Sequence, residues 1–168
     1  MKKTLIVIDM QNDFIDGALG TPEASAIVGR VRKKIDAYRA DGSEVIFTRD
    51  THAEDYLETP EGKKLPVVHC VRGTHGWQIS DMLDTDGCRI IDKPSFGYTK
   101  WDEFDFESIE LVGLCTDICV VSNALILKAL FPCAEIRADA SCCAGVTPAT
   151  HSAAIQTMKM CQIDITGE

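Results

Sequence analysis

The segment IELVGLCTDICVVSNALILKAL, Ile109–Leu130, decides the expected fold because it joins two kinds of pattern. Ile109–Leu114 is a short apolar run of the kind found in buried strands, and Asp117–Leu130 is typical of a helix. A cysteine, Cys119, stands at the start of that helix. A buried strand that leads directly into a helix is the repeating unit of α/β folds.

The rest of the chain repeats this alternation of apolar runs and helical patterns. Further strands are predicted at Thr4–Ile8, Glu44–Thr48, Cys88–Ile91, Glu135–Ala138 and Gln162–Ile165. Two more helices are predicted, one from Pro22 to Asp41 after Thr21, and one over Pro148–Met160 with Thr147 as its N-cap. The strands lack polar alternation, so we expect an α/β fold with three α/β/α layers, Rossmann-like, around a mostly parallel central sheet.

The length and charge of the chain limit the number of domains and the classes of molecule it is expected to bind. Its 168 residues fit one domain, residues 1–168. It carries 17 Lys and Arg against 26 Asp and Glu, a net charge of −9, and its longest basic run is Arg32–Lys34. This charge opposes polyanions, so we expect neither nucleic acid nor membrane as a partner. A small-molecule substrate and a metal ion remain compatible with it.

The first apolar run and the cysteines together predict a cytoplasmic location. The apolar run Thr4–Ile8 near the start is too short for a signal peptide or a membrane span. Eight cysteines without such a signal are typical of a cytoplasmic protein whose thiols stay reduced. Most are expected to be small buried residues, with one candidate for a reactive thiol.

Polar residues cluster where the predicted strands end. Following the strands in chain order, they are Asp9, then Asp50 and His52, then Lys93, then Cys119. In parallel α/β sheets ligands bind outside the carboxyl ends of the strands, so we expect these side chains at one edge. A dinucleotide site would need a GxGxxG turn after the first strand, and the sequence DGALG at Asp16–Gly20 does not supply it.

Three of these residues form a candidate catalytic group. A thiol at a helix start, such as Cys119, feels unpaired N–H groups that favour the thiolate. Asp9 is placed to take its proton, and Lys93 to hold both groups. Each residue also has an ordinary interpretation: a buried thiol packing under Val120, a carboxylate that caps a turn, and a surface cation.

A second group has the spacing of metal ligands. Asp50 and His52 are two residues apart, which puts both on the same side of an extended segment. A third ligand from a nearby loop would complete a facial set for a divalent ion. This spacing is also common by chance, so on the residues alone both interpretations stand.

Three separated motifs carry a family resemblance. They are LIVIDMQNDF at Leu5–Phe14, FTRDTH at Phe47–His52 and VGLCTDICV at Val112–Val120. The sequence resembles the isochorismatase-like cysteine hydrolases and, within them, most the nicotinamidases. The resemblance implies a triad in which Asp9 is the base, Lys93 the positioning cation and Cys119 the nucleophile. It also implies a cis peptide before Cys115, with the amides of Cys115 and Cys119 as the oxyanion hole.

The same resemblance implies a divalent metal ion, Zn, Mn or Fe. Asp50, His52 and His69 match the family's ligands, and Glu61 matches a fourth ligand present in some members. The ion's implied role is to hold the pyridine nitrogen of nicotinamide, so that the carboxamide carbon lies over the nucleophile.

The substrate pocket departs from the family pattern. Phe14 is expected to stack on the substrate ring. Nicotinamidases usually have a bulky aromatic residue three positions before the second metal-binding histidine, where this chain has Pro66. Tyr98 or Trp101 is expected to supply the missing aromatic wall.

The activity implied is hydrolysis of a small amide, nicotinamide to nicotinate and ammonia, with a place in NAD salvage. Two alternatives stay open. One is a related cysteine hydrolase that acts on a carbamoyl or ureido amide without the metal. The other is a binding protein that kept the scaffold and lost the activity. The resemblance also implies a homo-oligomer.

Overall fold

The computed structural model describes residues 2–168 and contains a six-stranded sheet in which every pairing is parallel. The order of the strands across the sheet is β3-β2-β1-β4-β5-β6. They are β1 (Lys3–Ile8), β2 (Glu44–Asp50), β3 (Arg89–Lys93), β4 (Ser108–Leu114), β5 (Glu135–Ala144) and β6 (Asp164–Thr166). This order is that of doubly wound α/β folds and confirms the predicted fold class.

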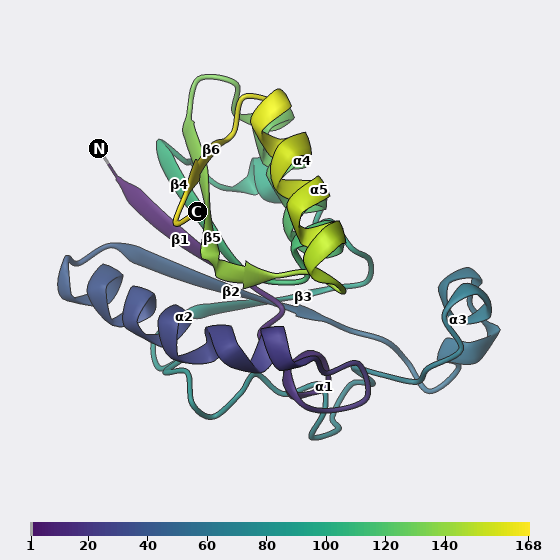
Figure 1. Cartoon of the computed structure of the whole chain (residues 1–168). Helices are drawn as coiled ribbons and strands as arrows, with labels where there is room; N and C mark the ends of the chain where they lie inside the picture. Colours follow the sequence, from purple (N-terminus) through teal and green to yellow (C-terminus); the bar gives the residue numbers. More distant parts are fainter. Residues whose placement is uncertain (1) are drawn as a thin grey trace.

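Helices cover both faces of the sheet (Figure 1). The covering helices are α1 (Asn12–Ile15), α2 (Pro22–Ala40), α4 (Val121–Leu130) and α5 (Pro148–Met160), whereas α3 (Pro60–Lys64) stands apart from the sheet. Helices α1 and α2 pack on one face, whereas α4 and α5 pack on the other. The result is the three-layer arrangement expected from the strands. None of the helices within residues 2–168 combines the length and apolar character needed to cross a lipid bilayer.

Strand β1 shows why the apolar runs lack polar alternation. Leu5 and Val7 pack in the core under α2, whereas Ile6 and Ile8 pack in the core under α4 and α5. All four side chains are fully buried. Because successive residues of a strand point to opposite faces, a strand covered on both sides must be apolar at every position.

The two long predicted helices start at their predicted caps. The Thr21 hydroxyl accepts a hydrogen bond from the Ala24 amide at 3.0 Å, and Thr147 likewise caps α5 by accepting from the Thr150 amide. Each cap satisfies one of the unpaired N–H groups at a helix start. Pro follows both caps, where its missing N–H costs nothing.

Two strands run further than predicted. Strand β3 ends at Lys93 rather than Ile91, and the backbone of Lys93 lies opposite that of Asp50 in β2. Strand β5 continues past Ala138 to Ala144. In both cases charged residues within the strand are paired with opposite charges from neighbouring elements, so polarity does not end the strand.

The segment after β4 also differs from the prediction. Residues Thr116–Val120 form a π-helical turn, and the regular helix α4 begins only at Val121. The amide of Val120 donates to the carbonyl of Cys115, five residues earlier, at 3.0 Å. Single π-turns of this kind occur frequently at functional sites.

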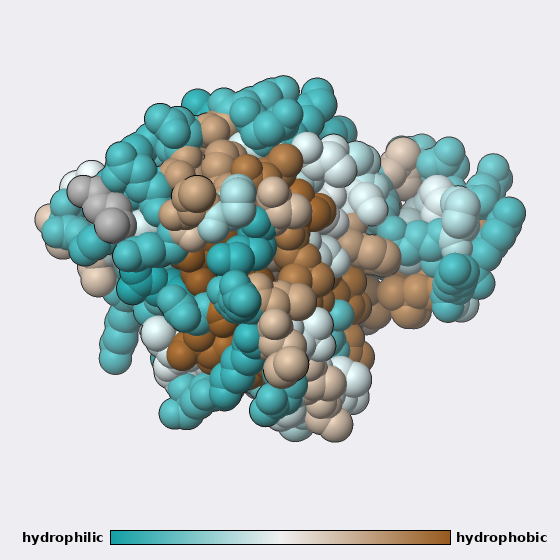
Figure 2. Space-filling view, turned by 90° about the horizontal axis from the view of Figure 1, so that it is seen from above, coloured by the Kyte–Doolittle hydropathy of each residue, from teal (hydrophilic) through white to brown (hydrophobic). Residues whose placement is uncertain are grey.

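An arm stands out from the body between β2 and β3. It includes α3 and a 3-10 turn at Tyr56–Glu58. In the view from above, apolar residues reach the surface where the arm meets the body (Figure 2). This junction is where the candidate site lies.

Candidate active site

The site lies at the point where the chain winds in opposite directions from two neighbouring strands. From β1 the chain proceeds to β2 on one side, and from β4 it proceeds to β5 on the other. Asp9 directly follows β1, and Cys119 lies in the turn after β4. Doubly wound sheets bind ligands outside this switch point, because the diverging connections leave a crevice there.

Lys93 contacts both other residues of the candidate triad, Asp9 and Cys119. Its Nζ lies 2.6 Å from Asp9 Oδ2 and 3.4 Å from Cys119 Sγ, and it donates to the Ser95 carbonyl at 3.1 Å. The side chains of Lys93 and Asp9 are wholly inaccessible to solvent. The polar groups predicted at separate strand ends thus meet in one buried cluster.

Asp9 is held in an unusual backbone conformation. Its φ is +46°, in the left-handed region that non-glycine residues rarely occupy. The Thr48 hydroxyl donates to Asp9 Oδ1 at 2.6 Å, and the Asp9 amide donates to the same hydroxyl oxygen at 3.2 Å. Strained residues of this kind cluster at functional sites, where the surrounding structure holds them in place.

Burial sets the protonation of the triad. It raises the pKa of Asp9, although the charge of Lys93 opposes that shift. Burial, followed by the negative charge of Asp9, raises the pKa of Cys119 well above that of a free thiol. Burial also acts to lower the pKa of Lys93, but Asp9 and its neighbours outweigh it and the pKa is raised. The resting cysteine is therefore a thiol beside a lysine cation, and not the free thiolate expected from a helix start.

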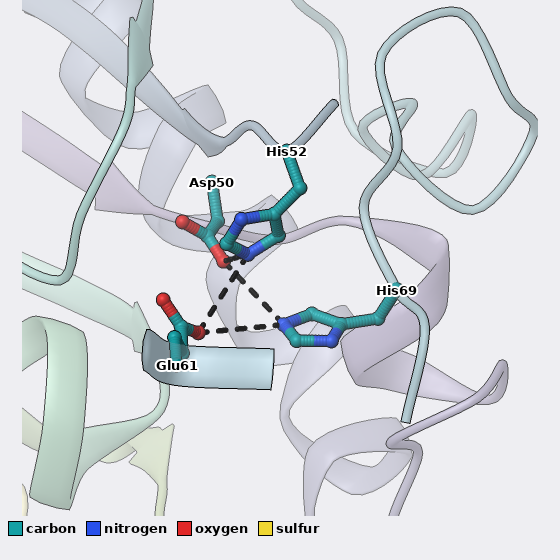
Figure 3. A group of neighbouring side chains, drawn as sticks. All are labelled: Asp50, His52, Glu61 and His69. Carbon is teal, nitrogen blue, oxygen red and sulfur yellow. Dashed lines mark hydrogen bonds and ion pairs between the residues drawn. The ribbon is translucent and has the colours of Figure 1, made fainter. Parts of the chain in front are cut away.

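The four predicted metal ligands converge beside the triad (Figure 3). His52 Nε2 lies 2.9 Å from Asp50 Oδ2 and 3.7 Å from Glu61 Oε1. His69 Nε2 lies 3.6 Å from Asp50 Oδ2 and 3.9 Å from Glu61 Oε1. One ligand atom from each residue lies within 4.8 Å of all the others. Glu61 comes from α3, so the protruding arm completes the group.

The geometry and chemistry of this group fit a divalent ion. Ligand atoms about 2.0–2.2 Å from Zn²⁺ lie roughly 3–3.5 Å from one another, close to the spacings found here. Two imidazoles and two carboxylates form a mixed N and O set suited to Zn, Mn or Fe. Burial acts to raise the pKa of Asp50, but hydrogen bonds with His52 and His69 outweigh it, so the pKa is lowered. Asp50 is therefore ionised, as a ligand must be.

Surrounding residues fix the orientation of the ligands. His69 Nδ1 lies 2.8 Å from the Val67 carbonyl, which leaves Nε2 facing the group. The ring of Tyr56 packs against both imidazoles, with centroids 4.6 Å from His52 and 4.9 Å from His69. The buried carboxamide of Gln11 donates to the Asp50 carbonyl at 2.9 Å and accepts from the Asp50 amide at 2.7 Å. These contacts hold the group in place from three directions.

A cavity of about 230 Å³ is lined by residues of both the candidate triad and the metal-ligand group. Its walls are mainly apolar, and its polar lining consists of Thr21, residues of the nucleophile segment and three of the predicted metal ligands. The lining residues are Phe14, Leu19, Thr21, Asp50, Glu61, Leu65, His69, Phe96, Cys115, Ile118, Cys119 and Val146. Small-molecule sites typically have this character, with apolar walls and a few convergent polar groups.

Of the aromatic residues predicted to contact the substrate, Phe14 lines the cavity and the others do not. Phe14 lines the cavity, and its ring meets that of His69 edge-on at 5.5 Å. Tyr98 and Trp101 are not among the described lining residues; their rings pack against each other at 5.0 Å, and Trp101 is fully buried in the core. Neither of the two residues expected to supply the aromatic wall therefore contributes to the lining as the structure describes it. Phe96, two residues before Tyr98, lines the cavity instead.

The peptide between Leu114 and Cys115 is cis, as the resemblance implied. Cys115 is one of the lining residues of the cavity, and burial raises the pKa of its thiol to about 12, which keeps it protonated. His151 Nδ1 lies 2.8 Å from the hydroxyl oxygen of Thr116. His151 thus contacts the nucleophile turn from α5.

Sequence reasoning missed residues that orient the site without reacting. They include Thr48 beside Asp9, Gln11 beside Asp50, Tyr56 beside the two histidines, and Asn123 behind Cys119. Thr48 and Gln11 lie within the quoted motifs, and a polar residue in an otherwise apolar stretch is a usable signal for such a role.

A comparison with family models matches residues 3–168 to the model described as "Isochorismatase domain". The chain belongs to the isochorismatase family. It is 25% identical to the nicotinamidase/pyrazinamidase of Mycobacterium tuberculosis over 183 residues, which cover 97% of each chain. This isochorismatase-family chain is a hydrolase, and the relatives it matches act on non-peptide C–N bonds.

Solved structures of the family superpose over nearly the whole chain. Pyrazinamidase of Pyrococcus horikoshii in complex with zinc is 25% identical, with a TM-score of 0.82 and full coverage of both chains. N-carbamoylsarcosine amidase from Thermoplasma acidophilum is 27% identical, with a TM-score of 0.78, and the match covers 99% of this chain and 96% of that one. The solved structures that resemble this chain therefore include a pyrazinamidase and an N-carbamoylsarcosine amidase.

Proposed function

We propose that this protein hydrolyses nicotinamide, or a closely similar aromatic carboxamide, to the acid and ammonia. The observation that carries the proposal is that a single, mainly apolar cavity is lined both by Cys119 and by Asp50 and His69 of the metal-ligand group. A flat ring that bears a ring nitrogen and a carboxamide presents two polar ends to such a cavity. The similarity to nicotinamidases and to a zinc-bound pyrazinamidase supports this choice.

In the first half of the proposed reaction, Cys119 attacks the amide carbon. Asp9 accepts the thiol proton, and the sulfur bonds to the carbon as the carbonyl becomes an oxyanion. The backbone amides of Cys115 and Cys119 are proposed to hold this oxyanion. When the carbonyl re-forms, the C–N bond breaks and Asp9 returns the proton to the departing ammonia.

In the second half, water attacks the resulting thioester. Asp9 accepts a proton from the water, and the C–S bond breaks to release the acid. The proton then returns to the Cys119 sulfur, which restores the thiol. Lys93 lies between Asp9 Oδ2 and Cys119 Sγ, so its charge balances whichever of the two is negative.

Asp50, His52, Glu61 and His69 would hold a divalent ion, which when bound supplies a Lewis acid for the ring nitrogen. Lys93 also lies 3.6 Å from Asp50 Oδ1, so one cation contacts both the triad and the ligand group. Phe14 and Ile118 offer apolar surface to the ring. Together these residues orient the carboxamide toward Cys119.

The rival activity is hydrolysis of a carbamoyl amide such as N-carbamoylsarcosine, which carries a carboxylate. An anionic substrate needs a cation beside it, but the described cavity lining contains no Lys or Arg. In this metal-free rival, the two carboxylates of the lining, Asp50 and Glu61, would carry uncompensated negative charge and repel an anion. The cavity therefore favours a neutral aromatic amide.

A panel of amides tests the proposal. Ammonia release is measured with nicotinamide, pyrazinamide and N-carbamoyl amino acids, and the Cys119→Ala variant serves as the blank. We expect release from the aromatic amides, loss of it in the variant, and loss on dialysis against a chelator. Release from carbamoyl compounds alone, or full activity of a folded Cys119→Ala, contradicts the proposal. No release from any amide favours the binding-protein alternative.

The location and assembly of the enzyme remain predictions. All eight cysteines are free thiols, which supports a cytoplasmic location. The homo-oligomer implied by the resemblance is tested by measuring the mass of the protein in solution.

A further inference from the structure

Asn123 is a buried polar side chain that the proposed reaction does not use. It lies on α4 one turn after Cys119, and its relative exposure is 0%. Trp101, which bonds to it, and Ala124 and Leu127 on the same helix belong to the apolar core. A carboxamide is costly to bury unless its hydrogen bonds are made, so its presence calls for an explanation.

Every hydrogen-bonding group of this carboxamide has a partner, and the four partners belong to four different residues. Nδ2 donates to the Cys119 carbonyl at 2.7 Å and to the Phe96 carbonyl at 3.1 Å. Oδ1 accepts from the Tyr98 amide at 2.9 Å and from Trp101 Nε1 at 2.9 Å. Two N–H donors and two acceptor lone pairs are the full capacity of an asparagine side chain.

These bonds close a ring with Lys93. Lys93 Nζ contacts Cys119 through its sulfur and the 95–98 segment through the Ser95 carbonyl. Asn123 contacts Cys119 through its carbonyl and the same segment through the Phe96 carbonyl. The nucleophile and the 95–98 segment are therefore joined twice, once by Lys93 and once by Asn123.

We propose that Asn123 is a positioning residue that holds the 95–98 segment against the turn carrying Cys119. The segment supplies a backbone partner to Lys93 and a wall, Phe96, to the cavity. Without Asn123, both Cys119 and Lys93 keep their chemistry but lose one of the two links that set their relative position. The catalytic consequence rests on the proposed amidase function; the positional claim does not.

A narrower role is the competing explanation. Asn123 could serve only its own helix, by bonding the carbonyl of Cys119 four residues earlier. A serine at this position can make that bond, because Ser hydroxyls donate to the carbonyl four residues back, but it is too short to reach Phe96, Tyr98 and Trp101. Asn123→Ser therefore separates a bridge between segments from a local helix contact.

The experiment compares Asn123→Ser with Ser122→Ala in the zinc-loaded, full-length protein. Ser122 is the neighbouring position on α4 and leaves the Asn123 carboxamide intact. Hydrogen exchange of the peptide covering residues 94–101 is measured by mass spectrometry, together with kcat and KM for nicotinamide. We expect exchange in this peptide to quicken about 10-fold in Asn123→Ser alone. We expect kcat to fall about 10- to 100-fold, with a smaller change in KM.

Two other outcomes overturn the proposal. Unchanged exchange and kcat in Asn123→Ser mean that the contact within α4 suffices. Faster exchange throughout the sheet, with kcat and KM altered in parallel, means a general loss of stability rather than positioning. If the wild type releases no ammonia from nicotinamide, the proposed function fails, whereas the exchange of residues 94–101 still decides the role of Asn123.

Discussion

Replacing Lys93 with methionine tests the electrostatics of the site. The methionine nearly matches the apolar stem of lysine but carries no charge, so Asp9 and Asp50 lose the cation that lies 2.6 Å and 3.6 Å from them. Removing one partner of a buried ion pair costs about 3–5 kcal/mol. We expect Lys93→Met to lower the free energy of unfolding at pH 7 by about this amount and to abolish ammonia release.

The stability lost in Lys93→Met should depend on pH, and the ionisation of the buried carboxylates determines the direction of that dependence. Burial already raises the pKa of Asp9, and removing the Lys93 charge raises it further. The native variant then binds more protons than the native wild type between about pH 4 and pH 7, while the unfolded chains do not differ at these sites. Stability of the variant relative to wild type therefore rises as pH falls, by about 1–3 kcal/mol between pH 7 and pH 5.

Urea unfolding at pH 7 and pH 5 measures both effects. It is followed by the fluorescence of Trp77 and Trp101 in chelator-treated protein, so that metal binding does not contribute. Lys34→Met is the matched control, because Lys34 also pairs with two carboxylates, Glu110 and Asp139, but lies outside the site.

Lys34→Met should lower the free energy of unfolding by about 1.5–3 kcal/mol. It should leave ammonia release unchanged, because Lys34 contacts no residue of the triad. A loss below about 1 kcal/mol in Lys93→Met refutes the reasoning. So does a loss that is the same at pH 5 and pH 7, since the buried carboxylates would then not be responsible.

Three further predictions follow from the same geometry. Asp9→Asn should lower kcat for nicotinamide by about 10²–10⁴-fold with an unchanged circular dichroism spectrum, and a smaller loss would exclude it as the proton acceptor. His69→Ala should weaken zinc binding, measured by competition with a chelator, by at least about 100-fold, whereas His75→Ala on an exposed loop should not; equal affinities would contradict the ligand assignment. Gly113→Ala should destabilise the protein by more than about 3 kcal/mol in urea unfolding, since its Cβ would lie 2.1 Å from a backbone oxygen of β1 and its φ is +118°. Gly29→Ala, which meets nothing within 4 Å on a helix, should instead stabilise by about 0.5–1 kcal/mol, and a loss there would show that the comparison of contacts fails.

Much of the framework could be predicted because it depends on local patterns. The apolar run Thr4–Ile8 falls within β1, and Thr21 and Thr147 cap the helices that were expected to follow them. Sheets buried on both faces leave a strong apolar signal, and caps need only a hydroxyl at one position. The residues proposed for catalysis, such as Asp9 and Cys119, come from strand ends, and the order of the strands brings these ends together.

The rest depended on contacts between distant segments. Strand β3 runs to Lys93 because Asp9 lies beside it, and no local pattern marks a lysine as fully buried. Tyr98 was placed in the cavity as an aromatic residue, whereas its backbone amide bonds to Asn123 and its ring packs on Trp101, at the edge of the core. Which aromatic residue of one loop faces a cavity is decided by such packing, and sequence spacing does not report it.

The central claim is that Cys119 attacks the amide carbon and carries the acyl group. The most direct test is rapid acid quenching during turnover of nicotinamide, followed by peptide mapping by mass spectrometry. The account predicts a nicotinoyl group in place of the thiol hydrogen of Cys119 and on no other residue. An acyl group on another residue, or none on Cys119 while ammonia release continues, would contradict it.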